Sequence, residues 1–390
     1  MEIERILLRL EQAGFEGYLV GGCVRDRLMG KEPHDYDITT SALPEEMLEV
    51  FAEERVIETG LKHGTVTVLT AQGGVEITTY RQDGTYSDHR HPDQVQFTRS
   101  LKEDLARRDF TVNAMAMDQK GAIIDPFGGQ ADLTKKIIRC VGDPRRRFEE
   151  DALRILRGLR FSSRFGFTIE EKTAAAMMGK RHLLQQIAKE RVFTELCGLL
   201  MGKDCRAVLN CHRQVIETVL PELKRLDIIT YEKALQRVEN TPLEETLRFA
   251  AFLLDLGMET AEKILVRLKV SNCFLKTVLL LIREFDVPCS ENRIAVRCRC
   301  AAMGAEAFLK LVDLWQAAGE TNGAFYRRTV KELLEEGACL SLKALAVNGK
   351  DLQKLGLSGT EIGNTLNVLF EKVLNEELPN EKQILLAQLE

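Results

Sequence analysis

Two kinds of hydrophobic pattern divide this chain at about Arg145. Before that residue, short runs rich in β-branched and aromatic residues are separated by Gly and Asp, which is typical of a sheet. These runs lie at 18–20, 36–39, 65–69, 75–80, 95–97, 112–117 and 122–124. After Arg145, apolar residues recur with helical spacing nearly to the end of the chain. The sequence therefore predicts an α+β protein, with a sheet-containing head followed by an all-helical remainder.

Composition excludes several classes of protein. The 390 residues, 45% of them hydrophobic, can form more than one core. No apolar run approaches the roughly 20 residues that cross a bilayer, so we expect a cytoplasmic protein without membrane contact. The ten cysteines show no C-x-x-C pair and the six histidines no metal-binding spacing. We therefore expect no Cys/His metal centre.

The charge distribution is uneven. The formal net charge of −5 argues against a chain that coats nucleic acid indiscriminately. Residues 135–164, however, hold ten Lys and Arg against four Asp and Glu. Taken alone, such a segment is as compatible with a solvated helix face as with an RNA-binding surface.

A glycine pair marks a candidate phosphate site in the first third. Residues 18–20 read as a strand, and they are followed by Gly21, Gly22 and, three residues later, Arg25. Glycine lets backbone N–H groups approach phosphate oxygens where a strand turns into a helix, and an arginine can donate paired hydrogen bonds to them. Most Gly-Gly pairs are ordinary turns, so the neighbouring motifs must support this interpretation.

Two carboxylates follow a dozen residues later. Asp35 and Asp37 lie in a strand-like run, where alternation would place both on one face, close enough to share divalent cations such as Mg²⁺. Two bridged metals would activate a 3′-hydroxyl and stabilise the charge on an α-phosphate and its leaving pyrophosphate. Glu76, on another alternating run, is a candidate third acid, although an exposed strand residue explains it equally well.

Several motifs occur in the order found in one enzyme family. GGCVRDRLMGKEPHDYDITTSALPEE is followed by RRDFTVNAMAMD, DPFGG and RFEEDALRILRGLRF. These segments resemble the successive motifs of class II tRNA nucleotidyltransferases. The resemblance covers roughly the first 200 residues, includes Glu190 and Arg191 as a last motif, and extends to AVNGKD at 346–351.

The resemblance implies a polymerase β-like head with a mixed sheet, followed by helical neck, body and tail. We assign these to 1–145, 146–200, 201–285 and 286–390, with the nucleotide-selecting motif in the neck and tRNA binding in the tail. It further implies Mg²⁺ as cofactor, and tRNA, CTP and ATP as partners. A homodimer is one assembly that the sequence leaves open. The implied metal ligands and catalytic residues are Asp35 and Asp37, and the implied nucleotide-binding residues are Gly22, Arg25, Arg108, Asp151, Arg154, Arg157 and Arg160.

The segment 148–160 also makes chemical sense by itself. On one continuous helix, Asp151, Arg154, Arg157 and Arg160 would step by three and form a winding ridge. A carboxylate beside a guanidinium can read a base edge, with Asp151 accepting from an exocyclic amine and Arg154 donating to the adjacent ring acceptor. Cytosine and adenine share that pattern, whereas uracil and guanine do not. An i,i+3 salt bridge between Asp151 and Arg154 is the structural alternative, just as Arg108 is open to interpretation as a surface charge.

The polar segment between Tyr80 and Phe97 predicts a mobile surface loop. In the family that the chain resembles, a loop at this place helps switch the pocket from C to A addition, which argues against a CC-only enzyme. We therefore expect addition of C, C and A to tRNA from CTP and ATP, without a nucleic-acid template. An A-adding-only enzyme and a poly(A) polymerase are the nearest alternatives, and a non-catalytic RNA-binding protein is a distant one.

Overall fold

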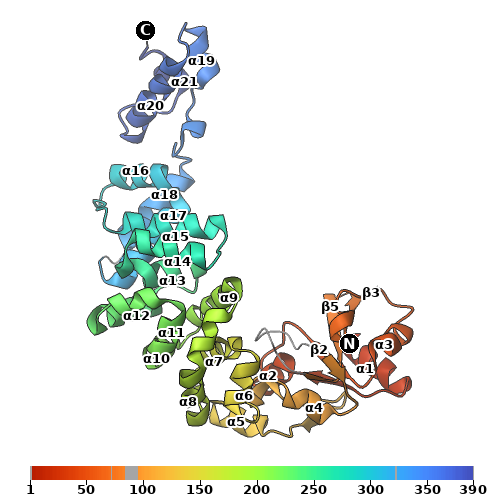
Figure 1. The fold of residues 1–390 in the computed structure, drawn as a ribbon. Helices are drawn as coiled ribbons and strands as arrows, with labels where there is room; N and C mark the ends of the chain where they lie inside the picture. Colours follow the sequence, from red (N-terminus) through yellow and green to blue (C-terminus); the bar gives the residue numbers. More distant parts are fainter. Residues whose placement is uncertain (1, 72, 84–94, 321–322, 390) are drawn as a thin grey trace. The chain divides into compact units, whose positions relative to one another are not determined.

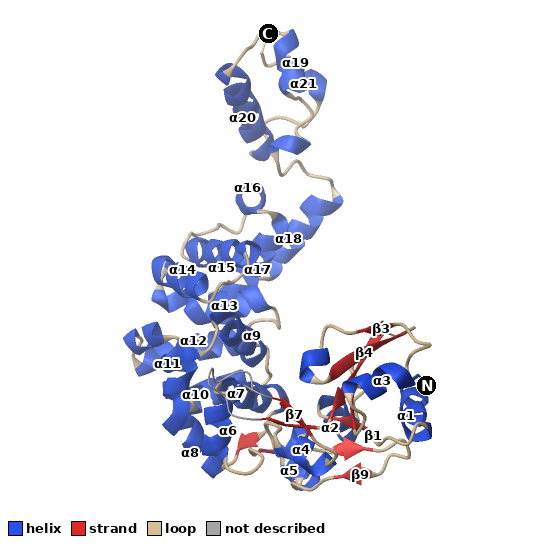
Figure 2. Ribbon diagram, turned by 45° about the vertical axis from the view of Figure 1, so that its right-hand side comes forward, coloured by secondary structure: helices blue, strands red, loops and turns tan. Residues whose placement is uncertain are grey.

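The computed structural model describes residues 2–71, 73–83, 95–320 and 323–389. The chain divides into two compact units, Met1–Pro221 and Glu222–Glu390. The first unit holds the strands and the second is helical (Figure 1; Figure 2). The predicted α+β class is therefore confirmed, while the finer bounds of head, neck, body and tail remain a prediction. No helix in the described residues is long and apolar enough to cross a membrane.

A seven-stranded mixed sheet forms the centre of the first unit. Its spatial order is β3-β4-β5-β2-β1-β8-β9, and β2 and β5 are the parallel pair within it. The strands are β1 (Gly17–Val20), β2 (Asp37–Thr40), β3 (Val56–Ile57), β4 (Thr65–Thr70), β5 (Gly73–Thr79), β8 (Ala116–Met117) and β9 (Ile123–Ile124).

Alternation along the strands sends neighbouring side chains to opposite faces of this sheet. On β1, Leu19 packs in a cluster with residues of α1 and α3, such as Leu10 and Met47. The next residue, Val20, packs instead in a cluster with Leu105 of α4. Helices therefore pack on both faces of the sheet at β1.

Eleven α-helices accompany the sheet in the described part of the first unit. They are α1 (Glu2–Gln12), α2 (Gly22–Leu28), α3 (Pro44–Val50), α4 (Leu101–Ala106), α5 (Gly129–Lys135), α6 (Pro144–Glu150), α7 (Leu153–Phe165), α8 (Glu171–Lys180), α9 (Lys189–Leu200), α10 (Cys205–Cys211) and α11 (Arg213–Val219). A short parallel pair, β10 (Ile137–Ile138) with β11 (Thr168–Ile169), flanks α6 and α7 in sequence. This pair fixes the start of α6 and the end of α7 close together.

Two sequence predictions in this unit are wrong. The run 112–117 is not one strand, because residues 111–113 form a 3₁₀ turn and only Ala116–Met117 pair in the sheet. The start of the segment between Tyr80 and Phe97 is not loop either, since β6 (Arg81–Asp83) pairs antiparallel with β7 (Val95–Phe97), the strand predicted at 95–97. The rest of that predicted loop, residues 84–94, lies outside the described residues.

The second unit consists of helices packed around aromatic and aliphatic side chains. Trp315 lies edge-on to Phe308, and its indole N–H donates to the Phe285 carbonyl at 2.7 Å. A separate apolar cluster, which includes Leu352 and Leu369, holds the last helices together. The helices are α12 (Ile228–Asn240), α13 (Glu245–Leu253), α14 (Met258–Arg267), α15 (Asn272–Phe285), α16 (Arg293–Met303), α17 (Ala305–Ala318), α18 (Ala324–Glu335), α19 (Gly349–Lys354), α20 (Thr360–Leu374) and α21 (Lys382–Leu386).

Candidate nucleotide-binding site

One cavity of about 630 Å³ in the first unit is lined by every metal-binding and nucleotide-binding residue that the resemblance implies. The predicted residues that line it are Asp35, Asp37, Gly22, Arg25, Arg108, Asp151, Arg154, Arg157 and Arg160. They come from β2 and its preceding segment, from α2, from the turn after α4, and from the region of α6 and α7. The fold therefore brings together predicted residues that are up to 138 positions apart in the sequence, from Gly22 to Arg160.

The cavity is strongly positive. Among the described residues, eight arginines and four aspartates line it. Residues that the sequence prediction did not assign to the site complete the lining: Gly21, Arg107, Asp109, Asn113, Phe161, Arg164 and Arg191. A concave site with this excess of guanidinium groups suits a polyanion such as a nucleoside triphosphate.

The β1–α2 turn forms one wall, as the glycine pair predicted. Gly21 has a φ of 73°, a left-handed conformation that a residue with a side chain rarely adopts. A Cβ at Gly21 would lie 3.1 Å from Nη1 of Arg108 and 3.9 Å from Oδ2 of Asp37. The glycine therefore keeps the space between a cation and a carboxylate of the cavity open.

The predicted placement of the two carboxylates needs correction. Strand β2 begins at Asp37, so Asp35 lies in the bend before the strand and alternation does not set its direction. Both nevertheless line the cavity. Desolvation raises the pKa of Asp37 above its usual range; the Arg108 charge opposes this rise and the Asp35 charge adds to it. Two carboxylates that repel each other at an open cavity favour a bound cation.

Glu76 is exposed on β5, in register with Asp37 on the adjacent parallel strand. No group of three or more His, Cys, Asp and Glu side chains in the described part of the chain is arranged as a metal site. The cavity therefore offers a cation the pair of aspartates. Mg²⁺ is commonly bound in this way, through one or two carboxylates together with phosphate oxygens of the substrate.

Asp104, a fully buried carboxylate of α4, holds the arginines next to these aspartates. Its Oδ1 accepts from Nε and Nη2 of Arg107 at 2.9 and 2.8 Å, and its Oδ2 accepts from Nη2 of Arg108 at 3.3 Å. The Thr39 hydroxyl of β2 and the Arg81 amide of β6 donate to the same carboxylate at 3.3 and 3.4 Å. Nε of Arg108 is buried without a hydrogen-bond partner in the described structure. Arg108 is thus a positioned cavity residue and not a solvated surface charge.

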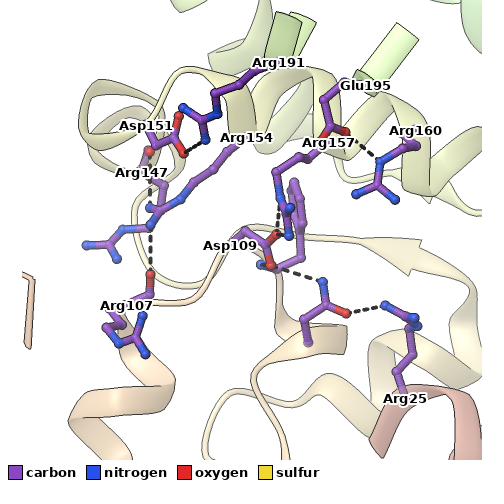
Figure 3. A network of polar contacts seen from close by, with 12 residues as sticks. Arg25, Arg107, Asp109, Arg147, Asp151, Arg154, Arg157, Arg160, Arg191 and Glu195 are labelled. Carbon is purple, nitrogen blue, oxygen red and sulfur yellow. Dashed lines mark hydrogen bonds and ion pairs between the residues drawn. The ribbon is translucent and has the colours of Figure 1, made fainter. Parts of the chain in front are cut away.

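A chain of hydrogen bonds crosses the cavity from α2 to α7 (Figure 3). Nη1 of Arg25 donates to Oδ1 of Asn113 at 2.6 Å, and the Asn113 amide donates to Oδ1 of Asp109 at 3.1 Å. Oδ2 of Asp109 accepts from Nε and Nη2 of Arg157 at 2.9 and 2.7 Å. Burial acts to raise the pKa of Asp109, but Arg157 and Asn113 more than offset it and lower the pKa to about 2. Asp109 is therefore charged when it fixes Arg157.

The predicted continuous helix from 148 to 160 is wrong. Helix α6 ends at Glu150 and α7 begins at Leu153, while Asp151 has extended backbone angles, φ −140° and ψ 103°. Oδ1 of Asp151 accepts from the Leu153 amide at 3.0 Å, so the side chain satisfies the first backbone N–H of α7, whose N-cap residue is Ala152. Its Oδ2 accepts from Nη2 of Arg191 at 3.3 Å (Figure 3). The pairing found for Asp151 is thus with α9.

Arg154 is anchored by several acceptors. Its Nη1 donates to Oε2 of Glu150 at 2.9 Å and to the Arg147 carbonyl at 3.3 Å, and its Nη2 donates to the Arg107 carbonyl at 3.0 Å. A carboxylate offers about four lone-pair sites, so Asp151, which accepts from the Leu153 amide and from Arg191, retains capacity to accept from a ligand. An anchored donor and an acceptor with spare capacity thus line the same cavity.

Arg160 is oriented by α9. Its Nε donates to Oε2 of Glu195 at 2.6 Å, and its guanidinium lies 4.3 Å from the centre of the Phe161 ring. A Cβ at Gly198 would lie 2.3 Å from Cδ of Arg160, so only glycine permits this approach. The three predicted neck arginines therefore all line the cavity, each held by a different acid: Glu150, Asp109 and Glu195.

Some of the lining residues that the sequence analysis did not assign lie inside motifs that could have indicated them. Asp109 and Asn113 lie four residues apart in RRDFTVN, directly after Arg108, which the resemblance had singled out. Arg191 belonged to the last matched motif, but its partner Asp151 lies 40 residues away, beyond any local pattern. Phe161 ends the matched motif RFEEDALRILRGLRF without an assigned role, and nothing in the local sequence marks Arg164 as a cavity residue.

Three family models match the chain. The poly(A) polymerase head domain matches residues 17–139. The RNA and SrmB binding site of polymerase A matches residues 166–226, and tRNA nucleotidyltransferase domain 2 matches residues 241–389. The first match contains Gly22, Arg25, Asp35, Asp37 and Arg108, which are five of the residues that line the cavity.

Full-length relatives agree with these matches. The CCA-adding enzyme of Lactobacillus helveticus is 38% identical over 99% of this chain and 95% of its own, and that of Levilactobacillus brevis is 38% identical over 98% and 95%. The crystal structure of the Bacillus stearothermophilus CCA-adding enzyme in complex with CTP has a TM-score of 0.83 at 32% identity, over 100% of this chain and 96% of that one. The chain therefore belongs to the CCA-adding enzymes, a family of tRNA nucleotidyltransferases.

Proposed function

We propose that this chain adds C, C and A to the 3′ end of tRNA from CTP and ATP, without a nucleic-acid template. One observation carries the proposal: a single cavity is lined by the paired acids Asp35 and Asp37 and by the base-reading candidates Asp151 and Arg154. The relative from Bacillus stearothermophilus that shares this fold is described in complex with CTP.

We further propose Mg²⁺ as the cofactor, held by Asp35 and Asp37. Their carboxylate oxygens are the hard ligands that this ion prefers, and the missing side chain at Gly21 leaves room beside Asp37. When bound, Mg²⁺ would supply charge stabilisation at the α-phosphate and the leaving pyrophosphate. The sequence alternative in which Glu76 adds a third carboxylate stays open.

The arginines are proposed to bind and orient the triphosphate. Arg108 and Arg25 lie at the β1–α2 wall, and Arg157 faces them across the Asp109–Asn113 link. Guanidinium groups held in place by acids lose little conformational freedom when they bind phosphate. The RNA 3′ oxygen would form its bond to the α-phosphorus as the bond to the β-phosphate breaks.

Base selection is proposed to rest on Asp151 and Arg154. The Asp151 carboxylate would accept from the exocyclic amine of cytosine or adenine, and Arg154 would donate to the adjacent ring nitrogen. Uracil and guanine would place a carbonyl against the carboxylate and leave it unpaired, which is costly inside a cavity. The partial burial of both side chains makes such a mismatch expensive.

The remaining proposals follow from family membership. We assign catalysis to the head at 1–145, base selection to the neck at 146–200, and tRNA binding to the helical tail at 286–390, which follows the helical body at 201–285. The reaction is placed in the cytoplasm, with tRNA, CTP and ATP as partners. A homodimer remains one candidate assembly.

The experiment supplies Mg²⁺ and three tRNAs that lack all, two or one of the CCA nucleotides, with CTP and ATP given separately and together. We expect every tRNA to be completed to CCA and then to stop, as read from product length on a sequencing gel. Extension of only the tRNA that lacks A would identify an A-adding enzyme. Continued addition of A would identify a poly(A) polymerase, and no product would leave an RNA-binding protein.

Variants test the metal assignment. Asp35→Ala or Asp37→Ala should reduce transfer of both nucleotides on the order of a thousandfold or more, because several kcal/mol of charge stabilisation is lost. Affinity for tRNA should change little. The matched control is Asp118→Asn, whose carboxylate accepts from the Lys120 and Ala122 amides in a turn outside the cavity. Near-normal transfer by either alanine variant would contradict the assignment.

A further inference from the structure

Three cationic side chains surround one aromatic ring at the edge of the cavity. The guanidinium of Arg25 lies 4.6 Å from the centre of the Phe165 ring, the Lys31 ammonium 5.7 Å and the Arg164 guanidinium 5.8 Å. Arg25 belongs to α2, Arg164 to α7, and Lys31 to the segment that follows α2. We call Lys31, Arg164 and the ring they share with Arg25 the Phe165 cluster.

The charges of this cluster are unbalanced. Arg25 is buried and paired with Asp26, whose Oδ1 accepts from its Nε and Nη2 at 2.9 and 2.8 Å. Lys31 and Arg164 are exposed and make no ion pair or side-chain hydrogen bond with any described residue. Burial lowers the pKa of Arg25, and the Arg164 charge lowers it further, which Asp26 opposes.

The contact of these three cations with one aromatic ring does not offset the repulsion between their charges. An exposed cation–π contact contributes roughly 0.5–1 kcal/mol, and a single Phe ring is shared here by three cations. Isolated surface cations usually diverge into solvent, but these three lie around one ring, two of them from α2 and the segment after it and one from α7. Such a grouping is the arrangement expected where an anion binds.

The position of the cluster indicates which anion. Arg25 and Arg164 line the nucleotide cavity, whereas Lys31 is not part of its lining. The positive charge therefore continues from inside the cavity to the surface outside it. A nucleoside triphosphate fits within the cavity, but the RNA strand that supplies the attacking 3′-hydroxyl must enter from outside. It carries a phosphodiester charge at every nucleotide.

We propose that Lys31 and Arg164 bind phosphodiester groups of the RNA strand directly upstream of its growing 3′ end. This proposal rests on the proposed function and adds to it a subsite for phosphate groups of the RNA. The subsite is separate from the site of the triphosphate. Phosphate contacts of this kind position a strand without reading its sequence, as is required when the last nucleotide changes at every addition.

The first test measures RNA binding without nucleotide or Mg²⁺, so it does not depend on catalysis. Fluorescence anisotropy with a tRNA that lacks CCA compares the wild type with Lys31→Gln, Arg164→Gln and the double variant over a series of salt concentrations. We expect a roughly tenfold weaker affinity for the double variant at low salt. The slope of log K against log salt should decrease by about 0.7 for each lost contact. Lys120→Gln, an exposed cation in the β8–β9 turn, is the matched control.

The second test removes the charge from the RNA. Neutral methylphosphonate linkages at the last three positions should weaken binding to the wild type and have little effect on the double variant, because the same contact is already missing. Lys31→Arg should retain normal binding. Both side chains are exposed, and far-UV circular dichroism checks that each variant is folded.

Steady-state kinetics separate the two sources of phosphate. The subsite predicts a raised KM for tRNA and an unchanged KM for CTP in the single variant Lys31→Gln, because Lys31 is not part of the cavity lining. A raised KM for CTP with normal tRNA affinity would assign the cluster to the triphosphate and overturn the proposal. Unchanged values for both would identify a solvated surface and overturn it as well. A wild type that binds RNA through the cluster but extends no tRNA would contradict the proposed function alone.

Discussion

Asp109 links the two sides of the cavity through its charge, and Asp109→Asn isolates that contribution. Asparagine keeps the shape and an oxygen that can accept from the Phe110 amide, but it removes the negative charge that faces Arg157. The carboxyl is 8% exposed, and its pKa falls from an ordinary 3.8 to about 2 in the folded chain. This shift corresponds to about 2 kcal/mol of stability at neutral pH.

The direction of the Asp109 pKa shift determines how the difference in stability between the wild type and Asp109→Asn changes with pH. Because the folded-state pKa lies below the unfolded-state value, the contribution is complete well above pH 4 and is lost as the pH falls toward 2. We therefore expect the wild type to exceed Asp109→Asn in free energy of unfolding by about 2 kcal/mol at pH 7 and by about 1 kcal/mol at pH 3. The buried guanidinium partner strengthens the effect, so it should persist at moderate salt.

Hydrogen exchange in a urea series, read by mass spectrometry on peptides covering 105–115, measures the stability of this region. Trp315 is the single tryptophan of the chain, and its fluorescence reports on the second unit, where no change is expected. Asp118→Asn controls for the loss of a carboxylate outside the network. An equal difference at both pH values, or none at either, would refute the reasoning that the Asp109 charge stabilises the fold.

Two predictions concern the neighbouring acids. Asp104→Asn should raise the KM for both CTP and ATP by roughly tenfold, because the fully buried charge that holds Arg107 and Arg108 is lost; steady-state kinetics with an unchanged KM would contradict this. Asp151→Ala should reduce incorporation of CTP and ATP relative to UTP by roughly tenfold, since the acceptor for the exocyclic amine is removed. Competition assays that show equal loss for all nucleotides would instead indicate a purely structural role.

Much of the site was predictable because several of its residues lie close together in short sequence motifs, whose local backbone structure places them side by side. The Gly21–Gly22 turn, Arg25 and the paired aspartates are specified within seventeen residues of sequence, and all line the cavity. The sheet was predictable wherever a strand is long and alternating, as in β4 and β5. Two-residue strands such as β3 and β10 have too few positions to show a period.

The errors arise where a side chain overrides the local pattern. Residues 112–117 are apolar enough for a strand, yet residues 111–113 form a tight turn in which Asn113 donates to Asp109. The spacing of Asp151 and Arg154 fits a helix, yet the Asp151 carboxylate caps the Leu153 amide and the helix is interrupted. Partners distant in sequence, such as Arg191 for Asp151, cannot be inferred from spacing at all.

The interruption between α6 and α7 separates the orientation of Asp151 from that of Arg157 and Arg160. In an unbroken helix each residue is rotated by about 100° from the last. Insertion or deletion of one residue in α6 would then rotate Asp151 and every arginine of α7 together. Here Arg157 and Arg160 keep their orientation through Asp109 and Glu195, whatever happens before Leu153. A change in the segment before Leu153 can therefore alter the position of Asp151 without turning Arg157 and Arg160 in the cavity.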